Sequence, residues 1–214
     1  KSKNKPFLIS VNNSSTHRPV RSFVRRKGRI TPSQKSALDN LMPKYGLQYS
    51  TDLGLIPISL LGDPEYPLII DIGFGNGELL ASMANENNQS NFIGIEVYDA
   101  GVGHCLNVID ERKIKNLKII NGDAVEVLRF GIVDASINEI NLLFPDPWPK
   151  KRHHKRRIIN DDFIQLISKK LMLNGLVNIS TDWENYAEQI DGLFSKRQNF
   201  AKKPFSGRGI STKF

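Results

Sequence analysis

The sequence has very little cysteine. Cys105 is the single cysteine among 214 residues, which excludes a disulfide framework and a cysteine-rich zinc site and predicts a reducing, cytoplasmic location. No apolar run approaches the roughly 20 residues that a membrane span needs, and no secretory signal pattern is present, so we expect no membrane-spanning segment. The chain begins with Lys1 and not with Met, so we expect its natural start to lie upstream.

Acidic residues are missing from two stretches that hold many of the cations. Residues 18–29 contain six Lys or Arg and residues 150–157 contain another six, with no acid in either. The whole chain carries +8 and the two stretches carry +12, so the rest of the chain sums to −4. Such blocks on an otherwise acidic chain favour a polyanionic partner, because each neutralised phosphate releases counterions. Composition alone leaves both nucleic acid and an anionic membrane open as that partner.

The organisation of the chain predicts one folded domain with a basic arm before it. Residues 1–30 are polar and basic with little periodicity, and we expect a flexible arm there. The pattern Thr31-Pro32-Ser33-Gln34 predicts a helix start with a capping box, so we assign residues 31–214 to the domain. A hydrophobic content of 39% with 11 Phe and 2 Trp is enough for a core.

Short apolar segments alternate with helical patterns from Pro67 onward. Strands are predicted at 68–70, 91–96, 117–120, 137–144 and 176–180. Helices are predicted between and after them, at 78–87, 98–112, 124–129, 160–172 and 183–194. This alternation is typical of an α/β fold with a parallel sheet covered by helices on both faces.

A glycine-rich turn follows the first of these strands. It begins at Asp71 and places Gly73, Gly75 and Gly77 at alternate positions. Such glycines let the backbone turn sharply and approach a ligand closely. The spacing differs from the G-x-G-x-x-G of dinucleotide binders, and the charge of Asp71 suits a cationic ligand such as a sulfonium better than a pyrophosphate.

Three further acids stand where the next strands end. Glu96 lies 19 positions after Gly77, close to the roughly 20-residue offset at which an acid meets a ribose in the related dinucleotide fold. Asp123 with Ala124 follows the third strand, and Asp146 follows the fourth. A single acid in such a place is more often a helix cap or a solvated carboxylate. Four on successive strands predict a ligand site, since the carboxyl ends of parallel strands share one edge.

The run after the fourth strand holds the remaining reactive side chains. Trp148 lies between two prolines, and the sequence leaves open whether it stacks on a base or packs the loop. His153 and His154 are adjacent within a Lys/Arg cluster and have no acid or cysteine nearby. We therefore expect no metal site, and contact with an RNA backbone or with solvent instead.

The four strand ends together resemble the ligand loops of class I S-adenosylmethionine-dependent methyltransferases. Longer motifs resemble the bacterial tRNA (guanine-N7)-methyltransferases more specifically. These motifs are Arg21–Arg26, FPDPWPKKRHHKRR over 144–157, Thr181-Asp182-Trp183 and Gly101-Val102-Gly103. The resemblance runs from about residue 18 to the end of the chain.

This resemblance implies a fold, a reaction and partners. The fold is a Rossmann-like class I methyltransferase with a mostly parallel seven-stranded sheet and helices on both faces. The reaction is methyl transfer from S-adenosyl-L-methionine to N7 of a variable-loop guanine in tRNA, with S-adenosyl-L-homocysteine as product and no metal. The substrate partner is tRNA, no membrane and no obligate protein partner is implied, and the protein is a monomer or a homodimer.

The resemblance also assigns residues to roles. Asp146 is implied as catalytic and as a cofactor contact. The other implied cofactor contacts are Asp71, Gly73, Gly75, Gly77, Glu96, Asp123 and Ala124. The implied substrate and RNA contacts are Arg25, Arg26, Lys150, Arg152, His153, His154, Lys155, Arg156, Arg157, Asp182, Thr212, Lys213 and Phe214.

The chain departs from the family pattern in two places. Asp71 stands where the family often has Glu, which shortens the reach of the carboxylate by one methylene. The C-terminal family motif continues from Thr-Lys-Phe to an acid, whereas this chain ends at Phe214.

Three other functions remain as alternatives. One is methylation of an exocyclic amino group, although those enzymes carry an Asn/Asp-Pro-Pro-aromatic loop and this chain has one Pro between Asp146 and Trp148. Another is a non-catalytic RNA-binding protein on the same fold. An NAD-linked oxidoreductase is the weakest, given the glycine spacing.

Overall fold

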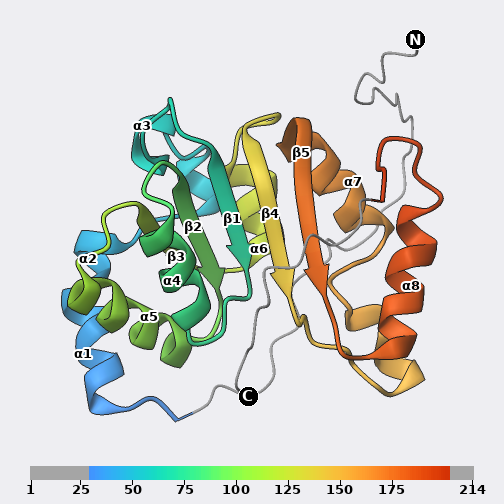
Figure 1. Ribbon diagram of the computed structural model, residues 1–214. Coiled ribbons are helices and arrows are strands. Elements are labelled where there is room, and N and C mark those ends of the chain that lie inside the picture. Colours follow the sequence, from blue (N-terminus) through green and yellow to red (C-terminus); the bar gives the residue numbers. More distant parts are fainter. Residues whose placement is uncertain (1–28, 203–214) are drawn as a thin grey trace.

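The computed structural model describes residues 29–202, and its centre is a parallel five-stranded sheet (Figure 1). The strands are β1 (Leu68–Ile72), β2 (Asn91–Glu96), β3 (Leu117–Asn121), β4 (Ile137–Leu143) and β5 (Leu171–Ser180). Their spatial order is β3-β2-β1-β4-β5, and every neighbouring pair is parallel. The chain therefore reverses its direction of winding between β1 and β4, which is where open α/β sheets bind ligands.

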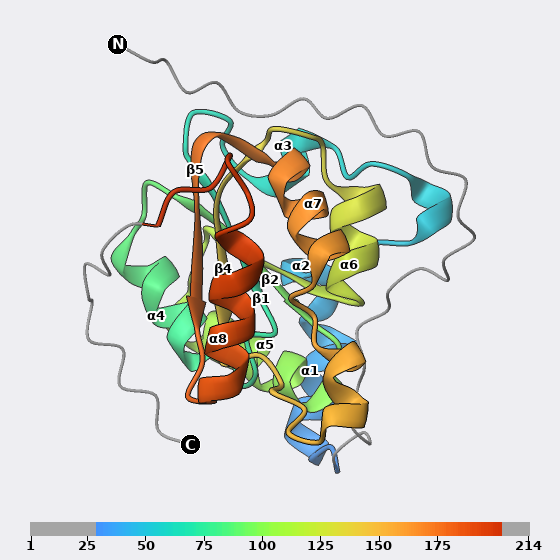
Figure 2. The same ribbon diagram turned by 90° about the vertical axis from the view of Figure 1, so that its right-hand side faces the viewer.

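Helices cover both faces of the sheet, as the alternating pattern predicts. One face packs against α1 (Pro32–Asn40), α2 (Met42–Tyr45), α4 (Glu78–Glu86) and α5 (Asp99–Arg112). The other packs against α6 (Ala124–Glu126), α7 (Asp161–Lys170) and α8 (Glu184–Phe194) (Figure 2). The short elements are α3 (Ile58–Leu61), the 3₁₀ turns η1 (Thr51–Leu53) and η3 (Lys151–Arg156), and the π turn η2 (Val127–Gly131).

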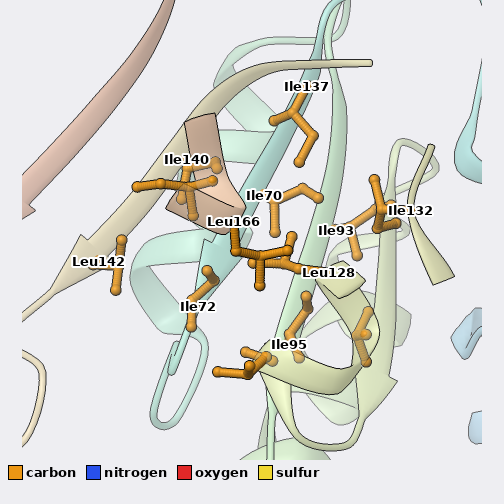
Figure 3. Packing of buried hydrophobic residues seen from close by; sticks show 14 of the residues in the cluster. Ile70, Ile72, Ile93, Ile95, Leu128, Ile132, Ile137, Ile140, Leu142 and Leu166 are labelled. Carbon is orange, nitrogen blue, oxygen red and sulfur yellow. The ribbon is translucent and has the colours of Figure 1, made fainter. Parts of the chain in front are cut away.

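The larger of the two hydrophobic clusters lies between the sheet and α6, α7 and η2. Branched side chains from three neighbouring strands interdigitate there (Figure 3). Ile70, Ile93 and Ile140 are fully buried and share one face because they occupy matching positions in the register. Burying such a side chain contributes about 1.5–3 kcal/mol, so this layer holds the strand ends in fixed relative positions.

Local signals in the sequence explain where several helices begin and end. The expected capping box is confirmed, because Thr31 Oγ1 accepts from the Gln34 amide at 3.3 Å while Gln34 Oε1 accepts from the Thr31 amide at 2.9 Å. The helix expected over 160–172 ends at Lys170, since Leu171 already pairs with Ile137 in the sheet.

The described residues form five strands, so they do not confirm the count of seven. The parallel arrangement with two covered faces is confirmed. No helix within residues 29–202 is long and apolar enough to cross a membrane.

Candidate active site

The glycine turn after β1 gives its three glycines two different tasks. All three have positive φ, +72° at Gly73, +62° at Gly75 and +80° at Gly77, which favours glycine. A Cβ atom built on Gly73 or Gly75 meets no atom of the described residues within 4 Å, so the backbone of this part of the chain leaves room for a ligand there. A Cβ on Gly77 would lie 2.4 Å from Cys105 Sγ. Gly77 therefore allows α4 to pack against α5. The backbone at Gly73 and Gly75 leaves space for a ligand, and we call this part of the turn the glycine cradle.

Glu96 fastens this turn to the end of β2. Its Oε2 accepts a hydrogen bond from the Gly75 amide at 3.0 Å, and its Oε1 accepts from the amides of Val97 and Tyr98 at 2.7 and 3.0 Å. Burial raises the pKa of the Glu96 carboxyl, the three amides oppose that rise, and the charge of Asp146 adds to it. Each carboxylate oxygen has two lone pairs, so Oε2 can accept a further hydrogen bond from a ligand.

Asp71 lies deeper in the sheet than the glycine turn. Its side chain is 3% exposed. Burial, with the charges of Glu96 and Glu139 adding to it, raises the pKa of Asp71 to about 7. The structure thus places Asp71 beneath the cradle, and a contact with a ligand requires the ligand to reach the end of β1.

Two asparagines near Asp71 did not emerge from the sequence analysis, the buried Asn141 and the partly buried Asn178. Asn141 pairs with Asp71 in the register of β1 and β4, and its Oδ1 accepts from Asn178 Nδ2 at 2.9 Å. Asn141 Nδ2 is buried and has no hydrogen-bond partner among residues 29–202, a rare condition in native proteins. The available signal is the single polar residue between apolar neighbours in both strands, Ile140-Asn141-Leu142 and Val177-Asn178-Ile179.

The acid at the end of β3 acts as a helix cap. Asp123 Oδ1 accepts from the amides of Val125 and Glu126 at 2.8 and 3.2 Å and starts α6, in which Ala124 is buried. A helix cap is the role that the sequence analysis named as the more common one for a single acid at a strand end. A second polar pair lies nearby, since Asn121 Nδ2 donates to Asp99 Oδ1 at 2.9 Å and so ties the end of β3 to the start of α5.

The loop after β4 presents Asp146 to solvent. Phe144 and Trp148 have φ values of +54° and +43°, conformations that cost energy for residues other than glycine. Asp146 influences the pKa of Glu96 through its charge, so the catalytic candidate lies within electrostatic range of the glycine turn.

Trp148 packs the loop and does not face solvent. Its side chain is 8% exposed. The His153 ring lies edge-on to it with centroids 6.0 Å apart, and the Arg156 guanidinium lies 5.0 Å from the indole centroid. Of the two roles that the sequence left open for Trp148, the structure therefore favours packing.

The basic cluster separates into exposed and buried members. Lys150, Arg152 and Lys155 are exposed, together with Lys151, while His153, His154 and Arg156 are partly exposed. Partial burial and the neighbouring cations, with Arg156 the largest of them, lower the pKa of His153, which favours a neutral imidazole there.

Arg157 requires a correction. It was expected to contact RNA, but it is 1% exposed. Its guanidinium donates to Pro147, Asn185 and Gln189 inside the protein. Sequence could not reveal this, since the partners on α8 lie about thirty positions further along the chain.

Asp182 is exposed in the loop between β5 and α8. The carboxyl ends of all five strands point the same way, and the loops that follow them, including η3, lie at that end (Figure 1). The expected contacts Arg25, Arg26, Thr212, Lys213 and Phe214 lie outside the described residues.

The known proteins that this chain resembles are methyltransferases. A family model described as "Putative methyltransferase" matches residues 65–206. The tRNA (guanine-N(7)-)-methyltransferase of Nitrosococcus oceani is 43% identical over 202 residues, which cover 92% of this chain and 84% of the relative. The enzyme of that name from Methylobacillus flagellatus is 42% identical over 207 residues, covering 90% of this chain and 87% of the relative.

A solved structure supports the fold independently. The crystal structure of precorrin-6y C5,15-methyltransferase from Geobacter metallireducens GS-15 matches with a TM-score of 0.50 and 12% identity, covering 64% of this chain and 66% of that chain. At this identity the likeness concerns the fold alone, the Rossmann-like fold of class I methyltransferases. The 43% identity to the Nitrosococcus oceani enzyme extends over 92% of this chain. This chain therefore belongs to the family of tRNA (guanine-N(7)-)-methyltransferases.

Proposed function

We propose that this protein transfers a methyl group from S-adenosyl-L-methionine to N7 of a guanine in tRNA, and that the guanine lies in the variable loop. The observation that carries the proposal is the placement of Asp146. It is exposed within electrostatic range of Glu96 and the glycine cradle, and the exposed cations of η3 follow it directly in the chain. The choice of N7 and of tRNA is supported by relatives of that name at 41–44% identity.

The residues at the strand ends suit S-adenosylmethionine. The open backbone at Gly73 and Gly75 admits a ligand closely, while the carboxylates of Glu96 and Asp123 suit the ribose hydroxyls and the adenine edge. Ala124 adds a small apolar neighbour. When bound, the cofactor supplies a methyl group on a positively charged sulfonium, which the acidic surroundings of the cradle favour.

Asp146 and Asp182 would hold the guanine. N7 carries a free lone pair, so no general base is needed to prepare it for attack. A carboxylate binds the amino and imino protons of the base and favours the positive charge that develops on the ring. We assign this task to Asp146 and a second anchoring contact to Asp182. Orientation of two reactants alone can lower a barrier by about 7–11 kcal/mol.

The exposed cations would capture the RNA backbone. Lys150, Arg152 and Lys155 face solvent close to the Asp146 loop, and His153, His154 and Arg156 are partly exposed beside them. A base whose phosphates are held by this segment arrives near Asp146. The contribution of Arg25, Arg26 and residues 212–214 stays a prediction, as do a seven-stranded sheet, a cytoplasmic location and a monomeric or dimeric state.

One assay tests the proposal. Unmodified tRNA is incubated with the enzyme and labelled cofactor, and the product is cleaved with chemistry selective for N7-methylguanine. Asp146→Asn is the matched variant, since it keeps the size of the side chain and removes its charge. We expect cleavage at a variable-loop guanine with the native enzyme and a loss of turnover in the variant. Methylation of an exocyclic amino group would leave the RNA uncleaved, and a failure to bind S-adenosylmethionine by calorimetry would support a non-catalytic RNA-binding protein.

A further inference from the structure

Arg157 is a buried cation whose hydrogen-bond partners are all neutral. Its side chain is 1% exposed, and no ion pair among residues 29–202 includes it. Lys170, the second buried cation among the residues that the structure describes, pairs with Asp134 at 2.6 Å. Burying an arginine without a carboxylate is costly unless its donors are satisfied, so the acceptors around Arg157 need an explanation.

These acceptors come from two separate parts of the protein. Nε donates to the Pro147 carbonyl at 2.8 Å, inside the loop that carries Asp146. Nη1 donates to Gln189 Oε1 at 2.5 Å and Nη2 to Asn185 Oδ1 at 3.1 Å, both on α8. The Tyr186 ring, one residue further along α8, lies 4.6 Å from the guanidinium carbon. One planar fork thus connects the Asp146 loop to one face of α8.

The loop needs such a support. Pro147 is the residue between Asp146 and Trp148, and positive φ values at Phe144 and Trp148 show that its shape is strained. Strained backbone persists only where surrounding contacts determine it. The hydrogen bond from Arg157 fixes the carbonyl of the residue directly after Asp146, and so fixes the direction in which the Asp146 side chain leaves the loop.

The other end of the connection lies close to the second proposed anchor. α8 begins at Glu184, two positions after Asp182, and Asn185 is in its first turn. A contact network reinforces this junction, because Tyr186 Oη accepts from the Ile159 amide at 3.2 Å and Gln189 Nε2 donates to the Ile159 carbonyl at 3.2 Å. Any shift of α8 relative to the loop would therefore break several hydrogen bonds at once.

We propose that Arg157 is a positioning residue that sets the placement of Asp146 relative to Asp182, by joining the Pro147 carbonyl to Asn185 and Gln189 of α8. It acts through these two carboxylates and contacts neither the RNA nor the cofactor. The inference rests on the roles assigned to Asp146 and Asp182 above. It also explains why arginine suits this position: lysine carries the same charge but cannot donate in three fixed directions.

The first test compares Arg157→Lys with Lys155→Ala by steady-state kinetics at several salt concentrations. For Arg157→Lys we expect kcat to fall about 10- to 100-fold, as for a small displacement of a reacting group. The KM for tRNA, the salt dependence of tRNA binding and the affinity for S-adenosylmethionine should stay within about twofold of the native values. Lys155→Ala, on an exposed cation of the same segment, should raise KM and reduce the salt slope by about 1 with kcat kept.

The opposite pattern would overturn the inference. If Arg157→Lys kept kcat but raised KM and flattened the salt slope, Arg157 would be an RNA contact. If Arg157→Lys lowered only the melting temperature, and kcat stayed native at temperatures at which the variant is folded, the role of Arg157 would be structural. Should Arg157→Lys fail to fold, the Asn185→Ala/Gln189→Ala pair leaves the guanidinium in place and removes its acceptors on α8. We expect that pair to lower kcat with KM kept, and an unchanged kcat would also overturn the inference.

A double-mutant cycle distinguishes this inference from the proposed function. Arg157→Lys should cause little further loss of kcat in an Asp146→Asn background, because the carboxylate that it positions is already absent. Losses that multiply would mean that Arg157 does not act through Asp146. If Asp146→Asn alone kept the native kcat, the proposed role of Asp146 would fail, and the inference would fail with it. If only Asp146→Asn lost activity, the proposed function would stand without the inference.

Discussion

Replacing Gly73 by alanine separates the two costs of a side chain in the glycine cradle. The first cost is conformational, because Gly73 has φ +72° and an L-residue in that region costs about 1–2 kcal/mol. For a chain of 214 residues this corresponds to a fall in melting temperature of about 2–8 °C. The second cost falls on the ligand, since the new Cβ enters space that is open within 4 Å.

Gly54 provides the matched control. It has φ +68°, and a Cβ there also meets no atom of the part of the chain that the structure describes within 4 Å, but it ends η1 and lies outside the strand-end loops. Its ψ of −145° places it in a region that only glycine adopts readily. Gly54→Ala should therefore also lower the melting temperature and leave cofactor binding unchanged.

The assay is calorimetric titration of S-adenosylmethionine into both variants, well below their melting temperatures. We expect Gly73→Ala to raise Kd about tenfold or more, equivalent to at least about 1.4 kcal/mol, while Gly54→Ala binds like the native protein. Native affinity in folded Gly73→Ala would refute the cradle as the ligand site. An equal loss in Gly54→Ala would show that the effect is one of general strain.

Two further predictions concern stability. Burial, with the charges of Glu96 and Glu139 adding to it, raises the pKa of Asp71 from 3.8 to about 7. Between these pH values the folded protein keeps a proton on Asp71 that the unfolded chain has released. The proton therefore stabilises the folded state fully below about pH 4, and this stabilisation is lost as the pH rises to about 7. The melting temperature of the native protein relative to Asp71→Asn should therefore fall between about pH 4 and pH 7 in thermal scans, and a constant difference would contradict the raised pKa. Asn160 caps α7 by accepting from the Phe163 amide at 3.0 Å, so Asn160→Ala should lower the free energy of unfolding by about 1 kcal/mol, as measured by urea titration, and an unchanged midpoint would show that the cap contributes nothing.

The elements near the site could be predicted because their signals are local. The glycines of the turn after β1, the capping box at Thr31 and the alternation of apolar segments each depend on residues a few positions apart. That the strand-end acids share one edge also followed from the sequence, since parallel strands bring their carboxyl ends together. The expected ends of α7 and β5 were less accurate, because pairing of Leu171 with Ile137 in the sheet decided them.

The roles within the basic cluster depended on contacts between distant segments. By sequence, Lys155, Arg156 and Arg157 are equivalent cations, whereas in the fold Lys155 is exposed, Arg156 lies over Trp148, and Arg157 is buried against α8. The hydrogen-bonded pair Asn141 and Asn178 likewise depends on the β4–β5 register, which the sequence did not reveal.

The sequence by itself determined the parallel α/β architecture, the glycine turn with its four strand-end acids, and the basic segment after Asp146. These follow from periodicity, backbone freedom and charge, which adjacent residues specify. Only the tertiary structure decided which of those side chains are exposed at the strand ends and which are buried among other parts of the protein. Burial depends on which remote segments of the chain come into contact. Here the contacts with α8 bury Arg157, which by sequence alone is one cation of a basic cluster.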